Sequence, residues 1–204
     1  MNIAYRVGDG LYLNITNRCS NRCDFCIRNN GDGAYGSDSL WLEREPSEEE
    51  ILEAVFRCDL DQYREIVFCG YGEPGVRLDA CVSVAKEIKR RRPNTRIRIN
   101  TNGQTDLIFG RRTAPDYEGT FDSVSISLNA PTAEGYDRIC HSRFGMDAFY
   151  AVLRFAEDVK SFVPDTVFSV VRDFISDTEL ALCRKISEDT GVFLKVRDYI
   201  PPSV

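Results

Sequence analysis

The sequence predicts an α/β protein, folded as an open, partial barrel of six parallel strands with helices outside. Short apolar runs rich in β-branched residues alternate with helical hydrophobic patterns along all 204 residues. Strand–helix alternation of this kind is typical of parallel strands joined by right-handed crossovers. Six strands fit an open barrel better than a closed barrel of eight. We expect residues 1–204 to form a single domain.

The expected strands are bounded by Gly, Asn or Pro, and β-branched residues are frequent within them. In chain order they are 11–16, 65–70, 95–102, 123–130, 166–171 and 192–199.

Four helices are predicted between the strands, two of them from capping signals. Ser47 with Glu50, and Ser176 with Glu179, have the spacing of a capping box that opens a helix. The glycine-rich stretch 29–39 is expected to be a surface loop. Apolar residues at helical spacing define the buried faces: Ile51, Leu52, Val55 and Phe56; Leu78, Val82, Ala85 and Ile88; Phe149, Val152, Leu153 and Ala156; Leu180, Cys183 and Ile186.

Alternation within the strands predicts a polar lumen. The face under the helices must be apolar, so the alternate polar side chains should point inward, where each needs a hydrogen-bonding partner. We therefore expect a polar ligand in the lumen; the alternative is an open sheet with one wet face. The inward-facing set is Tyr12, Asn14, Thr16, Arg98, Asn100, Ser125, Ser127, Asn129, Lys195 and Arg197.

Composition excludes several classes of protein. The formal net charge of −6 argues against a basic protein that coats nucleic acid. No apolar run is long enough to span a membrane, and the first residues lack the features of a signal peptide, so a cytoplasmic protein is expected. In that compartment the eight cysteines are not expected to form disulfides.

Three cysteines follow the first strand in the pattern C-x3-C-x2-C, at Cys19, Cys23 and Cys26. Three thiolates on one tight loop suit a soft metal centre. A 4Fe–4S cluster held by three cysteines would leave one iron free for another ligand. Structural zinc sites take four ligands, so zinc would need a distant fourth residue. A redox pair of Cys23 and Cys26 would leave Cys19 unexplained.

Together with two further motifs, this spacing resembles the radical S-adenosylmethionine (radical SAM) superfamily. Phe25 occupies the aromatic position of the C-x3-C-x-aromatic-C motif. Residues 70–74, GYGEP, resemble the family's GGEP motif with Tyr71 in place of glycine, and NTNG at 100–103 resembles its TNG ending. NITNRCSNRCDFCIR, VFCGYGEP and DSVSISLNAP are most similar to the TatD-family-associated radical SAM proteins.

The resemblance implies the partial (β/α)6 TIM-like barrel of the radical SAM core and two cofactors, a 4Fe–4S cluster and S-adenosylmethionine. Cys19, Cys23 and Cys26 would bind three irons, and the fourth iron would bind the amino and carboxylate groups of S-adenosylmethionine. One electron, from a reductant such as flavodoxin or ferredoxin, would then give the 5′-deoxyadenosyl radical that abstracts hydrogen from substrate. The residues expected to contact S-adenosylmethionine are Phe25, Gly72, Glu73, Asn100, Ser125 and Ser127.

The substrate is expected to be a small polar molecule. The similarly compact carboxy-deazaguanine synthases and a queuine lyase suggest a deazapurine, and the subfamily suggests a TatD-type hydrolase in the same pathway. The alternatives are a glycyl-radical activating enzyme with a protein partner, and a non-catalytic Fe–S or zinc protein. The expected substrate-binding residues are Asn14, Arg28, Asn129, Arg143 and Arg197.

Two other features are interpreted as structural. The basic run 89–92 is expected to be a solvated helix end, where cations suit the helix dipole, so a nucleic-acid partner is not expected. The cysteines outside the triad show no paired spacing and are expected to be buried thiols instead of ligands of a second cluster: Cys58, Cys69, Cys81, Cys140 and Cys183.

Overall fold

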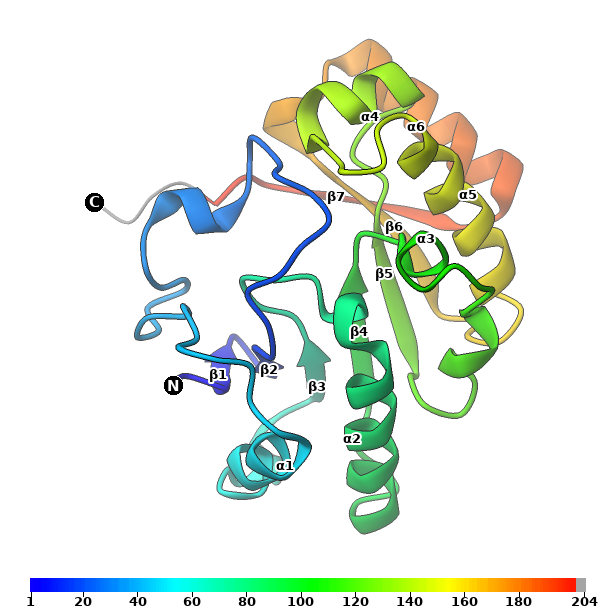
Figure 1. Cartoon of the computed structure of the whole chain (residues 1–204). Helices are drawn as coiled ribbons and strands as arrows, with labels where there is room; N and C mark the ends of the chain where they lie inside the picture. The colour runs from blue at the N-terminus through cyan, green and yellow to red at the C-terminus, as the bar shows by residue number, and fades with distance from the viewer. Residues whose placement is uncertain (201–204) are drawn as a thin grey trace.

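A computed structural model of the chain, which describes residues 1–200, contains one seven-stranded sheet in sequence order (Figure 1). Six neighbouring strands are parallel, which confirms the predicted open, partial barrel. The first strand is antiparallel to the second. The strands are β1 (Ala4–Val7), β2 (Gly10–Leu13), β3 (Glu65–Phe68), β4 (Ile97–Thr101), β5 (Ser123–Ser127), β6 (Thr166–Val171) and β7 (Phe193–Arg197).

Strand β1 was not among the predicted strands. It pairs with β2 through a tight hairpin at Gly8, whose φ is +59°, and no helix lies between the two strands. Because it lies outside the strand–helix alternation, that pattern gives no sign of it. Most of the other strands are shorter than predicted; β5, for example, ends at Ser127 before Asn129 turns into the left-handed region with φ +58°.

All four predicted helices form, and both capping boxes are present at Ser47 and Ser176. Two short helices, α3 and α4, were not predicted. The helices are α1 (Glu48–Phe56), α2 (Leu78–Arg91), α3 (Thr105–Phe109), α4 (Ala133–Cys140), α5 (Asp147–Val159) and α6 (Asp177–Thr190). Short 3₁₀ turns lie at η1 (Ile27–Asn30), η2 (Leu60–Gln62), η3 (Pro74–Arg77), η4 (Ala114–Tyr117) and η5 (Arg172–Phe174).

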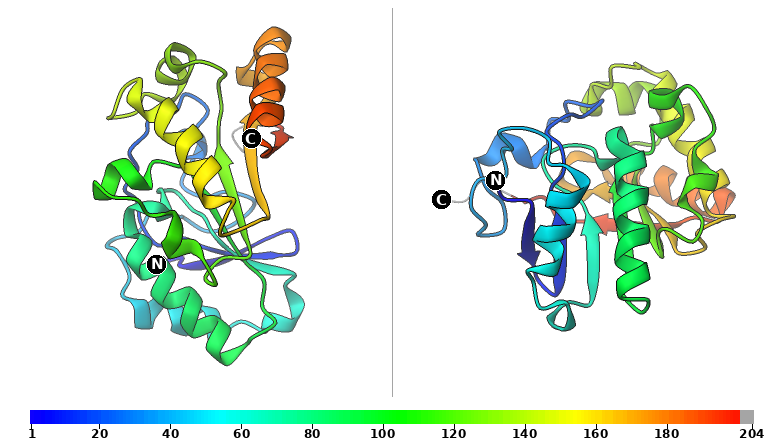
Figure 2. Two further views of the ribbon diagram at one scale, coloured as in Figure 1. Left: turned by 90° about the vertical axis from the view of Figure 1, so that its right-hand side faces the viewer. Right: turned by 60° about the horizontal axis from the view of Figure 1, so that its bottom comes forward.

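The apolar core lies between the sheet and the helices that cover its outer face (Figure 2). Ile99 of β4 and Ile126 of β5 are fully buried there, as the alternation predicts. The pattern weakens in β7, which is an edge strand: Leu194 is buried but Lys195 is exposed. The alternation places Lys195 on the same face as Arg197, but its side chain is exposed, because no strand follows β7 to cover it in the described part of the chain.

The glycine-rich loop 29–39 has no strand or α-helix, as predicted, but it is not simply a surface loop. Its Ala34 is buried against Leu40, Tyr5 and Tyr71, in a second small apolar cluster. The Tyr71 hydroxyl donates a 2.6 Å hydrogen bond to the carbonyl of Gly31. This contact explains why tyrosine stands in the GYGEP sequence: its side chain anchors the loop over β1 and β2.

Replacing Ile99 by Ala should lower the free energy of unfolding by about 2–5 kcal/mol, because its side chain is 0% exposed and a cavity would remain. Urea unfolding of the metal-free chain measures this. The matched control is Leu182→Ala on α6, where the side chain is 46% exposed and the loss should stay near 0.5 kcal/mol. Equal losses at the two positions would contradict the placement of the core.

Candidate cofactor and substrate site

The cysteine loop follows β2 at the carboxyl end of the parallel strands. Cys19, Cys23 and Cys26 are free and half-buried, and the amide of Cys26 donates to the carbonyl of Cys23 at 3.1 Å in a tight turn. Among residues 1–200, no three His, Cys, Asp or Glu side chains come together as ligands of a single metal ion. In a cubane each thiolate binds a different iron, so the three sulfurs need not converge on one point.

The surroundings of the thiols fit a sulfur-ligated cluster. Arg28 Nε donates to Cys26 Sγ at 3.3 Å, and the amide of Asn21 donates to Cys19 Sγ at 3.4 Å. N–H donors of this kind stabilise negative charge on sulfur. Burial raises the pKa of Cys19 to about 12, so its thiol is protonated at neutral pH and must lose that proton when iron binds.

The buried side-chain amide of Gln104 stabilises the cysteine loop through hydrogen bonds. Its Oε1 accepts from the hydroxyls of Ser20 and Ser142, at 2.8 and 3.0 Å. Its Nε2 donates to Asn21 Oδ1 and to the Tyr136 hydroxyl, both at 2.9 Å. The sequence analysis missed Gln104, although it directly follows the NTNG motif, because a single glutamine carries no pattern.

The carboxyl end of α4 holds the same loop from the side. The amides of Arg22 and Asp24 donate to the carbonyls of Cys140 and Ile139, both at 3.0 Å. These bonds satisfy helix-end carbonyls that have no partner within the helix. The cysteine loop is therefore fixed through its own backbone as well as through Gln104.

The GYGEP turn contacts the cysteine loop closely. A Cβ on Gly72 would lie 2.3 Å from the carbonyl oxygen of Thr16 and 2.7 Å from that of Arg18, so only glycine fits. The buried Glu73 carboxylate accepts from the amides of Gly75 and Asn102, at 2.8 and 2.6 Å. It also accepts from Thr101 Oγ1 at 2.7 Å. Both carboxylate oxygens of Glu73 therefore already accept hydrogen bonds from the chain itself, whereas the family resemblance implies that Glu73 contacts S-adenosylmethionine.

The other residues expected at S-adenosylmethionine lie around the lumen. Phe25 packs against Phe174 with ring centroids 5.3 Å apart. Asn100 Oδ1 accepts from Arg98 at 2.6 Å, and the Ser125 hydroxyl accepts from Arg197 at 2.8 Å. The half-buried Ser127 hydroxyl makes no hydrogen bond within the described residues. None of these four residues is hydrogen-bonded to another of the four.

A cavity of about 150 Å³ opens in the lumen, under the loop 29–39. Arg197 is the only one of the five expected substrate residues among its lining residues. Polar lumen groups elsewhere already have protein partners: Arg98, for example, pairs with Glu65 at 2.8 Å.

The remaining four expected substrate residues have other contacts. Asn14 is fully buried and donates to the carbonyl of Leu40 at 2.6 Å, which helps to fix the loop over the cavity. Arg28 lies at the thiol of Cys26, and Asn129 Nδ2 donates to Cys140 Sγ at 3.5 Å. Arg143 is exposed and stacks on its neighbour Phe144.

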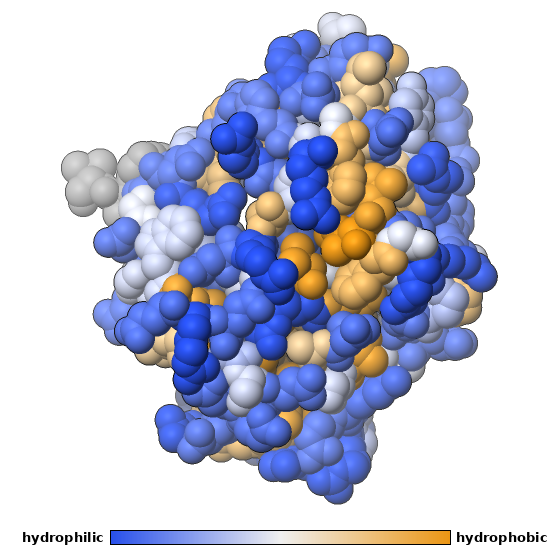
Figure 3. Space-filling model, in the orientation of Figure 1, coloured by the Kyte–Doolittle hydropathy of each residue, from blue (hydrophilic) through white to orange (hydrophobic). Residues whose placement is uncertain are grey.

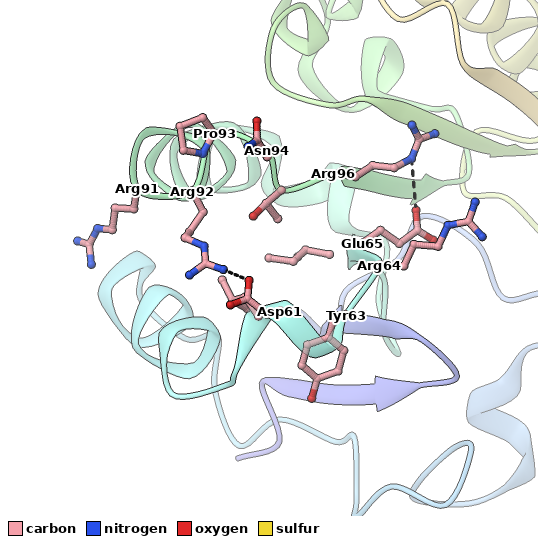
Figure 4. Close-up of a pocket in the computed structure, with 12 residues that line it drawn as sticks. Asp61, Tyr63, Arg64, Glu65, Arg91, Arg92, Pro93, Asn94 and Arg96 are labelled. Atoms are coloured by element: carbon pink, nitrogen blue, oxygen red, sulfur yellow. Dashed lines mark hydrogen bonds and ion pairs between the residues drawn. The ribbon is translucent and has the colours of Figure 1, made fainter.

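A larger hollow of about 340 Å³ lies at the opposite end of the sheet, where β3 and β4 begin (Figure 4). Arg92 pairs with Asp61, and Arg96 lies 3.9 Å from Glu65. Lys89, Arg90 and Arg91 also pair with carboxylates. The basic run lies at the end of α2, as predicted from the sequence, and its cations pair with carboxylates, which the sequence did not predict.

The surface is mostly hydrophilic on the face shown in Figure 3, with apolar side chains gathered in a strip near its centre. No helix within residues 1–200 is both long and apolar enough to cross a membrane.

Comparison with known proteins places the chain in a family. The sequence profile of the Radical SAM superfamily matches residues 13–181. The chain therefore belongs to the radical SAM superfamily, whose members use a 4Fe–4S cluster and S-adenosylmethionine.

Two curated proteins are similar in sequence to this chain. Molybdenum cofactor biosynthesis protein 1 of Drosophila melanogaster is 28% identical over 94% of this chain and 32% of its own length. GTP 3′,8-cyclase of Lactiplantibacillus plantarum is 29% identical over 66% of this chain and 37% of its own length. The chain thus spans about a third of the curated relatives that it matches.

Solved structures show the same fold. A radical SAM methyltransferase from Sphaerobacter thermophilus has a TM-score of 0.68 at 16% identity, covering 98% of this chain and 60% of its own. SuiB of Streptococcus suis bound to S-adenosylmethionine has a TM-score of 0.64 at 16% identity, covering 93% of this chain and 40% of its own.

Replacing Gln104 by Leu should reduce the iron that the chain incorporates and lower its free energy of unfolding by several kcal/mol. Each buried polar partner left without a bond costs about 1–3 kcal/mol. Iron analysis after anaerobic reconstitution and urea unfolding measure the two effects. Thr120→Val is the matched control, because Thr120 is equally buried but its hydroxyl donates only to the carbonyls of Asp116 and Glu118, at the end of η4. Full iron content in Gln104→Leu would contradict the bracing role.

Glu73 should make the metal-free chain less stable as pH rises. Burial raises its pKa to about 7, above the unfolded value of about 4.3. Between those values the folded chain holds a proton that the unfolded chain has lost, so rising pH lowers the free energy of unfolding by up to about 4 kcal/mol, and the loss levels off above pH 7.

Urea unfolding at several pH values between 4.5 and 8 tests this expectation for Glu73. The Glu73→Gln variant has no titratable group there, so its stability should change less with pH across the window. Parallel curves for the two proteins would show that Glu73 is not the titrating group.

Proposed function

We propose that this chain is a radical SAM enzyme that acts on a small polar molecule held in the lumen. The observation that carries the proposal is the meeting of three motifs at one end of the sheet. The cysteine loop after β2, the GYGEP turn after β3 and the NTNG sequence at the end of β4 are joined there through Gly72, Glu73 and Gln104.

In this proposal Cys19, Cys23 and Cys26 hold the 4Fe–4S cluster, and S-adenosylmethionine lies beside it. When bound, the two cofactors supply a radical that can take a hydrogen atom from a substrate. The chain itself positions the cluster ligands. Gln104 and the end of α4 fix the cysteine loop, and the backbone at Gly72 lies close to that loop.

Contacts to S-adenosylmethionine are assigned to Phe25, Asn100, Ser125 and Ser127 and to the backbone of Gly72 and Glu73. Asn100 and Ser125 offer polar atoms towards the lumen, and Ser127 has a hydroxyl without a partner within the described residues. Arg197 is assigned to the substrate; it lines the cavity together with Asn100 and donates to Ser125, so cofactor and substrate would be direct neighbours there.

The proposed substrate is a nitrogen heterocycle, which a deazapurine would satisfy. The name of the relative GTP 3′,8-cyclase supports a purine-like ring, although that relative is 29% identical and nearly three times as long as the region matched. Four further points remain predictions from the sequence. They are a lyase as the reaction type, a cytoplasmic location, a flavodoxin- or ferredoxin-like reductant, and membership of the TatD-associated subfamily with its hydrolase.

The test is anaerobic reconstitution followed by reduction in the presence of S-adenosylmethionine. The native chain should bind about four irons and four sulfides and release 5′-deoxyadenosine. Cys23→Ala should lose both iron and release, because two thiolates cannot hold the cluster.

Cys58→Ala is the matched control, because Cys58 is a half-buried thiol directly after α1 with a bond only to the carbonyl of Ala54. It should keep the iron content and 5′-deoxyadenosine release of the native chain. Stoichiometric zinc without iron in the native chain would instead support a non-catalytic metal protein. Cleavage only in the presence of a protein substrate would favour an activating enzyme.

A further inference from the structure

The lumen cavity is small and partly aromatic. Its volume of about 150 Å³ is comparable to a cavity that holds one benzene ring, and it is well below the size of pockets for larger ligands. Tyr5, Tyr12 and Tyr35 contribute to its wall, and the rings of Tyr5 and Tyr12 lie 5.7 Å apart. Such a space fits one small planar ring system with a small substituent.

Arg197 brings an uncompensated positive charge to this cavity. Its Nη2 donates to Ser125 Oγ, whereas its Nε is buried and has no hydrogen-bonding partner within residues 1–200. No carboxylate of that part of the chain forms an ion pair with it. Arg197 is half-buried as a residue, but a buried Nε donor with no partner is costly unless a ligand accepts from it, and an anion would do so best.

The nearby Arg98 is different, because Glu65 already neutralises it. It also donates to Asn100 and to the Tyr12 hydroxyl. One free guanidinium therefore faces the cavity, which matches the single charge of a carboxylate better than the larger charge of a phosphate.

We infer that the cavity binds a planar ring that carries a carboxylate, with the carboxylate on Arg197 and the ring beside the tyrosines. This inference rests on the proposed function and narrows its substrate from a polar heterocycle to a ring carboxylate. It also separates this chain from enzymes that act on a nucleoside triphosphate, because a triphosphate exceeds both the volume of the cavity and its charge.

The test is calorimetric titration of the reconstituted chain, under anaerobic conditions with S-adenosylmethionine present. The probes are nicotinate, its neutral counterpart nicotinamide, the non-aromatic cyclohexanecarboxylate, and GTP. Nicotinate should bind at least tenfold more tightly than nicotinamide, and also more tightly than cyclohexanecarboxylate. GTP should not displace it.

Three variants locate the charge that recognises the probe. Arg197→Gln should remove the preference for nicotinate over nicotinamide, and Arg197→Lys should keep part of it, because lysine retains the charge but not the forked donors. Lys195→Gln is the matched control: it removes one charge from the same strand at an exposed position, and it should leave the preference unchanged.

Equal binding of nicotinate and nicotinamide, or an unchanged preference in Arg197→Gln, would overturn the inference. Competition between nicotinate and S-adenosylmethionine would also overturn it, because Arg197 would then belong to the cofactor. Iron content and S-adenosylmethionine binding are measured on the same samples. If both are intact, a failure refutes only the ring carboxylate; if either is lost in the native chain, the proposed function fails instead.

Discussion

A buried polar network centred on Gln104 holds the cysteine loop in place, together with backbone hydrogen bonds to the end of α4. Cys23 and Phe25 also pack against the apolar core, but the thiols themselves are only half-buried. Gln104 makes four hydrogen bonds, which reach Ser20 and Asn21 on the loop and Tyr136 and Ser142 beyond it. A buried network of this kind specifies one arrangement when every member is satisfied, and all four of these contacts are made.

The same end of the sheet carries a second buried polar centre at Glu73. Its carboxylate joins the turn after β3 to the end of β4 through Thr101 and Asn102, so the two strand ends are held in register beyond the last ladder bonds. Asn102 also donates to Ser20 Oγ at 2.8 Å, which links Glu73 to the network of Gln104. The apolar core on the outer face of the sheet supports this polar centre, as in other parallel sheets covered by helices.

Much of this architecture could be predicted from the sequence, because it depends on local signals. The capping boxes at Ser47 and Ser176 and the alternation around Ile126 involve residues close together in the chain, and the structure contains all of them. The hydrogen bonds of Gln104 to the cysteine loop, and those of Glu73 to Thr101 and Asn102, could not be predicted in the same way. Their partners are far away in the sequence, up to 84 residues for Gln104 with Ser20, so only the folded chain reveals them.

The residues that bind the substrate were harder to predict from the sequence for a related reason. Alternation along a strand shows which face a side chain occupies, but it does not show whether another protein group has already satisfied it. Asn14 and Arg98 face inward as expected, yet the loop at Leu40 and the carboxylate of Glu65 take up their polar atoms. Arg197 differs from both because part of its guanidinium has no partner.

The proposed function requires that the cysteine loop holds a cluster that S-adenosylmethionine can reach. Electron paramagnetic resonance of the reduced, reconstituted chain, recorded with and without S-adenosylmethionine, tests this requirement. We expect the signal of a reduced 4Fe–4S cluster and a clear change in that signal when S-adenosylmethionine is added. A cluster signal that S-adenosylmethionine leaves unchanged, or no cluster signal in fully reconstituted protein, would contradict it.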